Sequence, residues 1–181
     1  MAYCATQTLS DIAVDCTSNV GGVSVVAIRN RADIEAITVT DDAVSAITLA
    51  SGDDVPDDAA VLAFRSQTCQ LSSEATIDDV AGVHFYTNTL AFRFNKMNAT
   101  KRASIKALAH AETIAIVKDN NGTYWLVGYD EPLRASAMVG TTGTAYTDAN
   151  EYTPTLACMS AELPLTVSSA AVATFLGDAV I

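Results

Sequence analysis

Apolar and polar residues alternate along much of this chain, and the alternation predicts strands. Residues 36–40 (AITVT) and 46–50 (AITLA) repeat nearly the same pattern ten residues apart. A period of two places successive side chains on opposite faces of a half-buried strand. Asp41 and Asp42 lie between the two segments and are typical turn residues, so the sequence predicts a β-hairpin over 36–50.

The longest alternating stretch is Val83–Met97, which the pattern predicts to be one long strand. Its aromatic and aliphatic residues fall on one face and its more polar residues on the other. Residues 68–77 also have strand character, and the turn signal Asp78–Gly82 joins the two segments. The sequence therefore predicts a prominent hairpin over 68–97, with strands longer than average.

Another hairpin is indicated at 113–129, where two apolar segments flank Asn120-Asn121-Gly122. Asn-Gly between apolar strands is a strong hairpin signal because a type I′ turn needs two residues with positive φ. Trp125, the one tryptophan of the chain, is expected to anchor the core.

Shorter strands and loops fill the remaining positions. Polar and glycine-containing segments predict loops at 51–60 and 130–151. Pro154 cannot donate to a strand ladder, which places its strand at an edge or a bulge. The expected short strands are 23–28, 61–64, 152–158 and 163–167.

Two short helices are expected. Thr100 is a suitable N-cap for a helix over 101–111, and Ile105, Leu108 and Ala109 give it an apolar stripe. Ser168 or Ser169 can cap a second helix that runs through Phe175. The prediction is a mainly β fold, sandwich- or barrel-like, with a long hairpin and one flanking helix. Residues 1–22 read as an N-terminal arm, and residues 23–181 as a single β-rich domain.

Length and charge limit the classes of function. The 181 residues suffice for one domain, and 50% hydrophobic against 17% charged residues excludes a disordered chain. The net charge of −11 argues against sequence-specific nucleic-acid binding. No apolar run reaches the ~20 residues of a membrane helix, and the N-terminus lacks the features of a signal peptide.

The charges are unevenly distributed. Eight carboxylates and no base lie between Asp33 and Asp58, whereas residues 93–106 hold five of the ten bases. One reading is that both segments are solvated surfaces. The other is that the basic segment meets the acidic 51–60 loop of a neighbouring copy, as a self-assembling protein would use them.

The sequence contains few residue patterns typical of catalysis or of metal or cofactor binding. We therefore expect no enzyme, no cofactor and no metal site. The cysteines (Cys4, Cys16, Cys69 and Cys158) form no C-x-x-C pair and are expected to be reduced, with a Cys4–Cys16 disulfide as the alternative. Cys69 and His84 match a thiol–imidazole pair by residue type alone. The aspartates at 53–58 lack EF-hand spacing, and residues 140–144 (GTTGT) lack the lysine of a phosphate-binding loop.

The middle and C-terminal segments carry a resemblance to a known family. HFYTNTLAFRFNKM (84–97), TKRASIKALAH (100–110), IAIVKDNNGTYWLVGYDEP (114–132) and GTAYTDANEYTPTL (143–156), followed by ELP (162–164), resemble virion proteins of tailed bacteriophages with gut-dwelling Bacteroidales hosts. The order of elements over 23–167 is similar to that of tail tube proteins.

The resemblance implies a virion protein, made in the host cytoplasm, that assembles with itself and with other tail proteins. Tail tube proteins form hexameric rings that stack into a hollow tube for genome ejection, and hairpins of the subunits line it as a β-barrel with an acidic lumen. Residues 68–97 are the first choice for barrel strands, and the 36–50 hairpin is the second. The arm and the 51–60 loop would contact the neighbouring ring. The bases at 93–106 would face a subunit interface, because DNA would adhere to them in the lumen.

Other classes remain open. A capsid decoration or tail terminator protein would share the β-rich composition but form single rings or isolated knobs. A host- or carbohydrate-binding β-sandwich needs exposed loop aromatics, for which Tyr129 and Tyr146 are the candidates. A small hydrolase is the third alternative.

Overall fold

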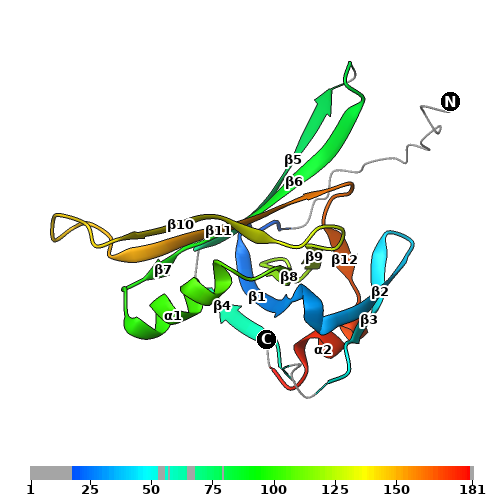
Figure 1. Ribbon diagram of the computed structural model, residues 1–181, viewed down its shortest axis with the longest axis horizontal. Coiled ribbons are helices and arrows are strands. Elements are labelled where there is room, and N and C mark those ends of the chain that lie inside the picture. Colours follow the sequence, from blue (N-terminus) through cyan, green and yellow to red (C-terminus); the bar gives the residue numbers. More distant parts are fainter. Residues whose placement is uncertain (1–17, 53–55, 57, 65–67, 79, 180–181) are drawn as a thin grey trace.

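The computed structural model of the protein describes residues 18–52, 56, 58–64, 68–78 and 80–179. Within them the chain forms two β-sheets and two short α-helices, which confirms the mainly β prediction (Figure 1). Neither sheet closes into a barrel over this part of the chain. Most of the expected arm, residues 1–17, lies outside the described residues.

The larger sheet has seven strands and holds the centre of the molecule. All its neighbours are antiparallel except β12 and β3, which run parallel. The expected hairpins over 36–50 and 113–129 both belong to it. In spatial order its strands are β2 (Ile34–Thr40), β3 (Ala43–Leu49), β12 (Leu165–Val167), β9 (Tyr124–Val127), β8 (Thr113–Asp119), β1 (Val23–Asn30) and β4 (Ala60–Ala63).

Strand β8 shows that this sheet is covered on both faces. Its first five residues are buried, and four of them, Ile114–Val117, form an apolar run typical of a fully covered strand. Ile114 and Ile116 lie in a core shared with the C-terminal helix, whereas Ala115 and Val117 lie in a core shared with the second sheet. The molecule therefore has three layers, with the seven-stranded sheet in the middle.

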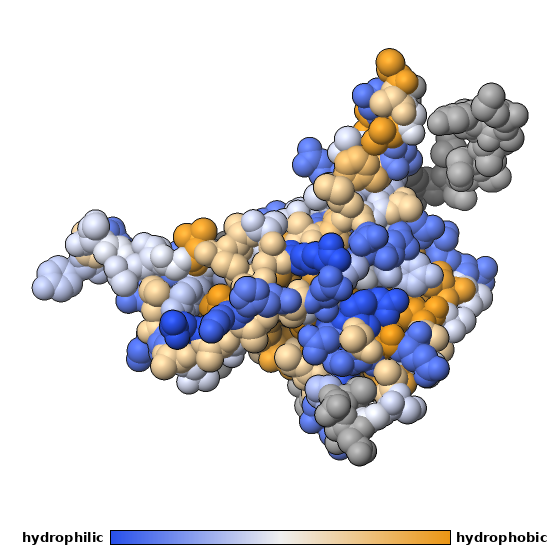
Figure 2. All heavy atoms as spheres, viewed as in Figure 1, coloured by the Kyte–Doolittle hydropathy of each residue, from blue (hydrophilic) through white to orange (hydrophobic). Residues whose placement is uncertain are grey.

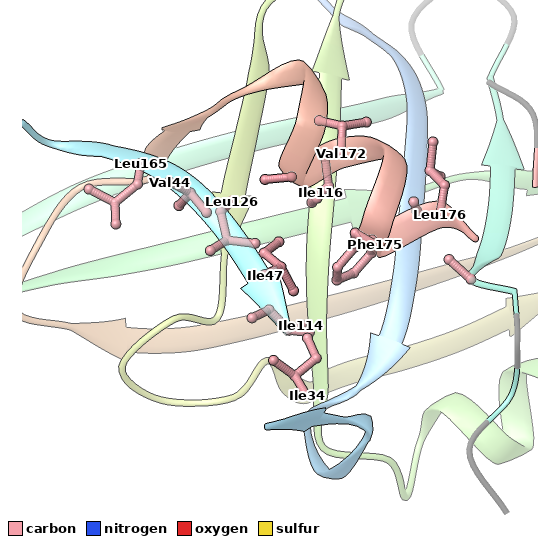
Figure 3. Close-up of a cluster of buried hydrophobic side chains, with 13 residues drawn as sticks. Ile34, Val44, Ile47, Ile114, Ile116, Leu126, Leu165, Val172, Phe175 and Leu176 are labelled. Carbon is pink, nitrogen blue, oxygen red and sulfur yellow. The ribbon is translucent and has the colours of Figure 1, made fainter. Parts of the chain in front are cut away.

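The C-terminal helix α2 (Ser169–Leu176) covers one face of the seven-stranded sheet (Figure 3). The Ser168 hydroxyl accepts a hydrogen bond from the Ala171 N–H, so the predicted cap is confirmed. Phe175 is fully buried among the core side chains. Arg29 of β1 lies beneath it and donates to the carbonyl oxygens of Phe175 and Pro56.

The second sheet covers the other face. Its strands are β10 (Arg134–Thr141), β11 (Glu151–Ser160), β6 (Val83–Phe92) and β5 (Cys69–Asp78), and the two-residue β7 (Phe94–Asn95) continues the line of β6 beside β11. The single strand expected over 83–97 is thus interrupted at Arg93. Leu90, Phe92 and Phe94 still share the inner face, as the alternation predicts.

Two predictions near this sheet were wrong in detail. The loop expected over 130–151 contains β10, a strand of small residues whose weak apolar pattern hides it. Of the two positions predicted for Pro154, the edge strand is wrong, because β11 is flanked by β10 and β6. The β11–β6 pairing begins at Thr155 and the β11–β7 pairing ends at Tyr152. Pro154 falls in that gap, where no donor is required of it.

The two-residue turn with positive φ forms at a different site from the Asn-Gly site that the sequence favours. The two-residue turn with positive φ at both positions lies at Asp41 (52°) and Asp42 (58°), between the paired residues Thr40 and Ala43. The Asn-Gly site instead forms a longer loop, in which Gly122 has a φ of 92° but Asn121 does not have a positive φ. The Asp119 carboxylate accepts from the backbone N–H groups of Asn121 and Thr123 and holds this loop.

Helix α1 (Ala99–Leu108) begins two residues before its expected start and ends three before its expected end. The cap is Asn98, whose side chain accepts from the Lys101 N–H, rather than Thr100. The helix lies on the surface, with Ile105 and Leu108 only half-buried. No described helix has the length and apolar character needed to cross a membrane.

Candidate assembly surfaces

The outer part of the β5–β6 hairpin is exposed regular structure. Ten consecutive residue pairs join its strands, from Cys69 opposite Phe92 to Asp78 opposite Val83. Cys69 is the one buried residue of β5, and the hairpin extends well beyond the body (Figure 1). The Asp78 carboxylate accepts from the Val80 and Ala81 N–H groups and orders the turn at the tip.

The inner face of this hairpin changes environment along its length. Near the body, Leu71 and Leu90 pack into the core between the two sheets. Farther out, the same face carries Ile77 and its pair partner His84, and both are exposed. The face that forms core at the base therefore continues outward without cover from any described residue.

The five-stranded sheet has two unpaired edges. Strand β5 pairs only with β6, and β10 pairs only with β11, within the described residues. The path β10-β11-β6-β5 is antiparallel at every step, so its two edge strands run in opposite directions. A long unpaired edge is a template for pairing with another chain.

The outer face of the same sheet is polar and rich in hydroxyl groups. The pairs Ser72–Thr89 and Glu74–Thr87 belong to it in the β5–β6 hairpin. Thr153 and Thr155 continue it on β11, opposite Val139 and Ala137 of β10. No described element covers this face, which is therefore available to solvent or to a partner.

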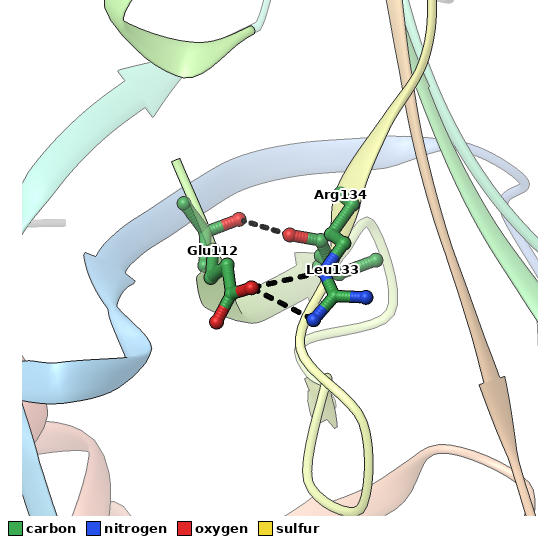
Figure 4. Close-up of polar contacts among 4 residues, drawn as sticks. Glu112, Leu133 and Arg134 are labelled. Atoms are coloured by element: carbon green, nitrogen blue, oxygen red, sulfur yellow. Dashed lines mark hydrogen bonds and ion pairs between the residues drawn. The ribbon is translucent and has the colours of Figure 1, made fainter. Parts of the chain in front are cut away.

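Both described arginines on this outer face are paired with carboxylates. Arg93 forms an ion pair with Glu151. Arg134, at the start of β10, pairs with Glu112, with 2.7 Å between Nη2 and Oε1 (Figure 4). The Glu74 and Asp78 carboxylates of β5 have no ion pair with a described residue. The outer face therefore presents hydroxyls and carboxylates but no unpaired described cation.

The tip of the β5–β6 hairpin is apolar. Val80 is completely exposed and Ile77 is 64% exposed. Figure 2 shows this apolar cap at the end of the projecting hairpin. An open groove of about 530 Å³ lies near the base of the hairpin, between Leu71, Trp125 and Leu163. Trp125 is only half-buried there and donates from Nε1 to Asp119, so it lines a groove as well as packing against the core.

The structure does not bring together the cysteine and the histidine that the sequence suggested as a thiol–imidazole pair. Cys69 and His84 lie at opposite ends of the hairpin, about 26 Å apart along the strands at ~3.3 Å per residue. Burial raises the pKa of the Cys69 thiol to about 12, so it is not a thiolate at neutral pH. Cys69 and Cys158 are free thiols, and Cys4 and Cys16 lie outside the described residues.

The remaining candidates give no site either. The described residues contain no group of three metal-binding side chains. Tyr129 packs against the core below α2, whereas Tyr146 stands exposed in the β10–β11 loop, so they form no shared aromatic surface.

Sequence reasoning missed the β10 edge and the ion pairs on the outer face. Alternation reveals strands that bury one face, and β10 buries little. Comparison with known proteins adds no family: no family model, curated protein or solved structure matches the chain.

Proposed function

We propose that this protein is a virion structural protein that assembles into stacked rings, six subunits in each, and forms the tail tube through which a phage genome is ejected. The observation that carries the proposal is the sheet β10-β11-β6-β5 with an unpaired strand at each edge. Joining β5 of one copy to β10 of the next removes both edges, which a closed ring does for every copy.

Strand direction and size are compatible with such a ring. Because β5 and β10 run in opposite directions, copies repeated around an axis continue the antiparallel pattern. Six copies supply about 24 strands; spaced ~4.8 Å apart and tilted by roughly 40°, these give a backbone wall about 48 Å across. That leaves a lumen wider than a DNA duplex after side chains are added.

The outer face of the sheet supports the assignment as the lumen wall. Its two described arginines are neutralised by ion pairs, and its unpaired charges are the carboxylates of β5. Such a wall repels phosphate groups, so DNA can slide without binding tightly.

The experiment is negative-stain electron microscopy of the purified protein, with light scattering alongside. We expect six-fold rings or hollow tubes. A dimer or trimer that never assembles further would contradict the proposal and favour a decoration or binding protein.

Two neighbouring proline variants test the edge directly. Adjacent residues of a strand point their N–H groups to opposite sides, so one of Ala75→Pro and Thr76→Pro removes a bond to β6 and the other removes a donor from the open edge. We expect the variant that removes the donor from the open edge to abolish rings and to leave the monomer as stable as wild type. Normal rings from both variants would exclude pairing through this part of β5.

A further inference from the structure

Three exposed cations near α1 have no ion-pair partner among the described residues. Lys96, Arg102 and Lys106 form no ion pair with a described residue, in contrast to Arg93 and Arg134. We call these three residues the basic face. Lys101 differs from them because its ammonium group donates to the carbonyl oxygens of Asn95 and Lys96.

One member of the basic face, Arg102, is also poorly placed for its own helix, whereas Lys106 lies in the last turn, where a cation is favourable. The first turn of α1 contains Lys101 and Arg102 and no acidic residue. The N-terminus of a helix carries partial positive charge and prefers anions, so cations in this turn are unfavourable. An anionic partner would compensate both the helix end and the cations.

The same chain carries a candidate partner on another surface. Glu35, Asp41 and Asp42 of the β2–β3 hairpin are exposed and form no ion pair with a described residue. We call these three residues the acidic hairpin. Figure 1 shows β2–β3 and α1 on opposite sides of the body, so one molecule cannot join the two surfaces by itself.

We propose that the basic face of one copy binds the acidic hairpin of a second copy, head to tail. A two-fold contact centred on either surface would bring like charges together. A heterologous contact brings opposite charges together and repeats from copy to copy, which leads to a ring or a filament. This contact is separate from the β5–β10 edge pairing and can exist with or without it.

A nucleic acid is the other anion that the basic face could meet. The chain is strongly acidic overall, with a net charge of −11, which opposes the approach of a phosphate backbone. Three cations would also give only weak, salt-sensitive binding. A second copy carries the same net charge, but it also presents the acidic hairpin, with three exposed carboxylates for the three cations, and we therefore take a second copy as the partner.

A charge exchange between the two surfaces tests the proposal. The helix variant is Arg102→Glu/Lys106→Glu. The hairpin variant is Glu35→Lys/Asp41→Asn/Asp42→Asn, which uses asparagine because that residue tolerates positive φ. The control variant, Glu131→Lys/Glu162→Lys, changes net charge by the same amount as the hairpin variant on another exposed surface.

Sedimentation velocity is measured in about 50 mM and about 500 mM salt, with weak and strong screening respectively. We expect wild type to self-associate more strongly in low salt. The helix and hairpin variants should each weaken association about tenfold, and the control should not. An equimolar mixture of the two variants should restore association, because the unaltered basic face of the hairpin variant then meets the unaltered acidic hairpin of the helix variant.

Several results would overturn the contact. These are no salt-dependent association of wild type, no restoration in the mixture, or equal loss in the control variant. Binding of a DNA duplex that is lost in the helix variant alone would assign the basic face to nucleic acid. Rings that persist in both variants would remove this contact but leave the tail-tube proposal standing. Salt-sensitive association without rings would support this contact and contradict the tail-tube proposal.

Discussion

Strands β8 and β5 have similar regular structure but opposite surroundings. Five of the seven residues of β8 are buried, with core on both faces, whereas Cys69 is the one buried residue among the ten of β5. Within the part of the chain that the structure describes, β8 has a paired neighbour on each side and β5 has one. The difference separates two tasks: the seven-stranded sheet holds the fold together, and the outer part of the five-stranded sheet presents surface.

The largest expected effect is the loss of a core side chain of the seven-stranded sheet. Phe175→Ala removes a fully buried ring below β8 and should lower the free energy of unfolding by about 3–5 kcal/mol. Val80→Ala, at the hairpin tip, should change it by less than about 0.5 kcal/mol. Urea denaturation of both variants measures the contrast. Similar losses of stability in the two variants would contradict the view that the seven-stranded sheet holds the fold together while the hairpin tip only presents surface.

Cys69 marks where β5 leaves the core, and its titration sharpens that boundary. Its folded pKa of about 12 exceeds the ordinary value of 9.0 because of burial. The unfolded chain therefore loses this proton first, and the stabilising contribution, complete below pH 9, is lost as pH rises towards 12. The slope reaches at most about 1.4 kcal/mol per pH unit.

Urea curves at pH 8 and pH 10 for wild type and Cys69→Ala measure this effect. Other groups also titrate in this range, so the difference between the two slopes is the relevant quantity. We expect the variant to lose less stability than wild type between the two pH values. Equal losses would mean that the base of β5 is solvated.

A smaller effect is expected at the turn of the β2–β3 hairpin. Asp42 has a φ of 58°, which asparagine tolerates and a β-branched residue does not. Asp42→Val should cost on the order of 1–2 kcal/mol, and Asp42→Asn should cost little. Thermal melts of the two variants give the comparison. Equal melting temperatures for the two variants would mean that this turn, at the edge of the seven-stranded sheet, accepts substitution as readily as the exposed tip of the β5–β6 hairpin.

The smallest effect is expected at the outer face of the five-stranded sheet. Glu151→Gln removes the partner of Arg93; the Arg93 side chain is 55% exposed and the Glu151 side chain 13%. Because the Arg93 end of the ion pair remains in water, the loss of stability should be no more than about 1 kcal/mol. A double-mutant cycle with Arg93→Gln measures the coupling between the two side chains. A much larger coupling would show that this face is structural rather than presented.

Strands and helices with one regularly apolar, buried face were predictable from the sequence. Elements without such a face were harder to place. The β2–β3 and β8–β9 hairpins follow from apolar alternation joined by polar turns. Strand β10 was missed because its residues, such as Ser136 and Ala137, are small and exposed, and its position is set by pairing with β11. That pairing joins segments whose contact no local pattern reveals.

Turn geometry and caps were predictable in type but not in position. Asn121-Gly122 has the better sequence for a two-residue turn, yet the Asp119 carboxylate binds two backbone N–H groups and stabilises a longer loop. Asn98 similarly replaces Thr100 as the cap of α1. The candidate surfaces depend on strand edges and unpaired charges, which exist only once the sheets are assembled.

The position of α2 has a consequence for how the protein is made. The core beneath β8 is closed by residues 169–176, and Arg29, near the start of the described chain, is held by the carbonyl of Phe175. A ribosome-bound chain that lacks this helix exposes Ile114 and Ile116 to solvent. The central layer can therefore become fully native only after residues 169–176 have left the ribosome, and until then the nascent chain exposes an apolar surface that chaperones can bind.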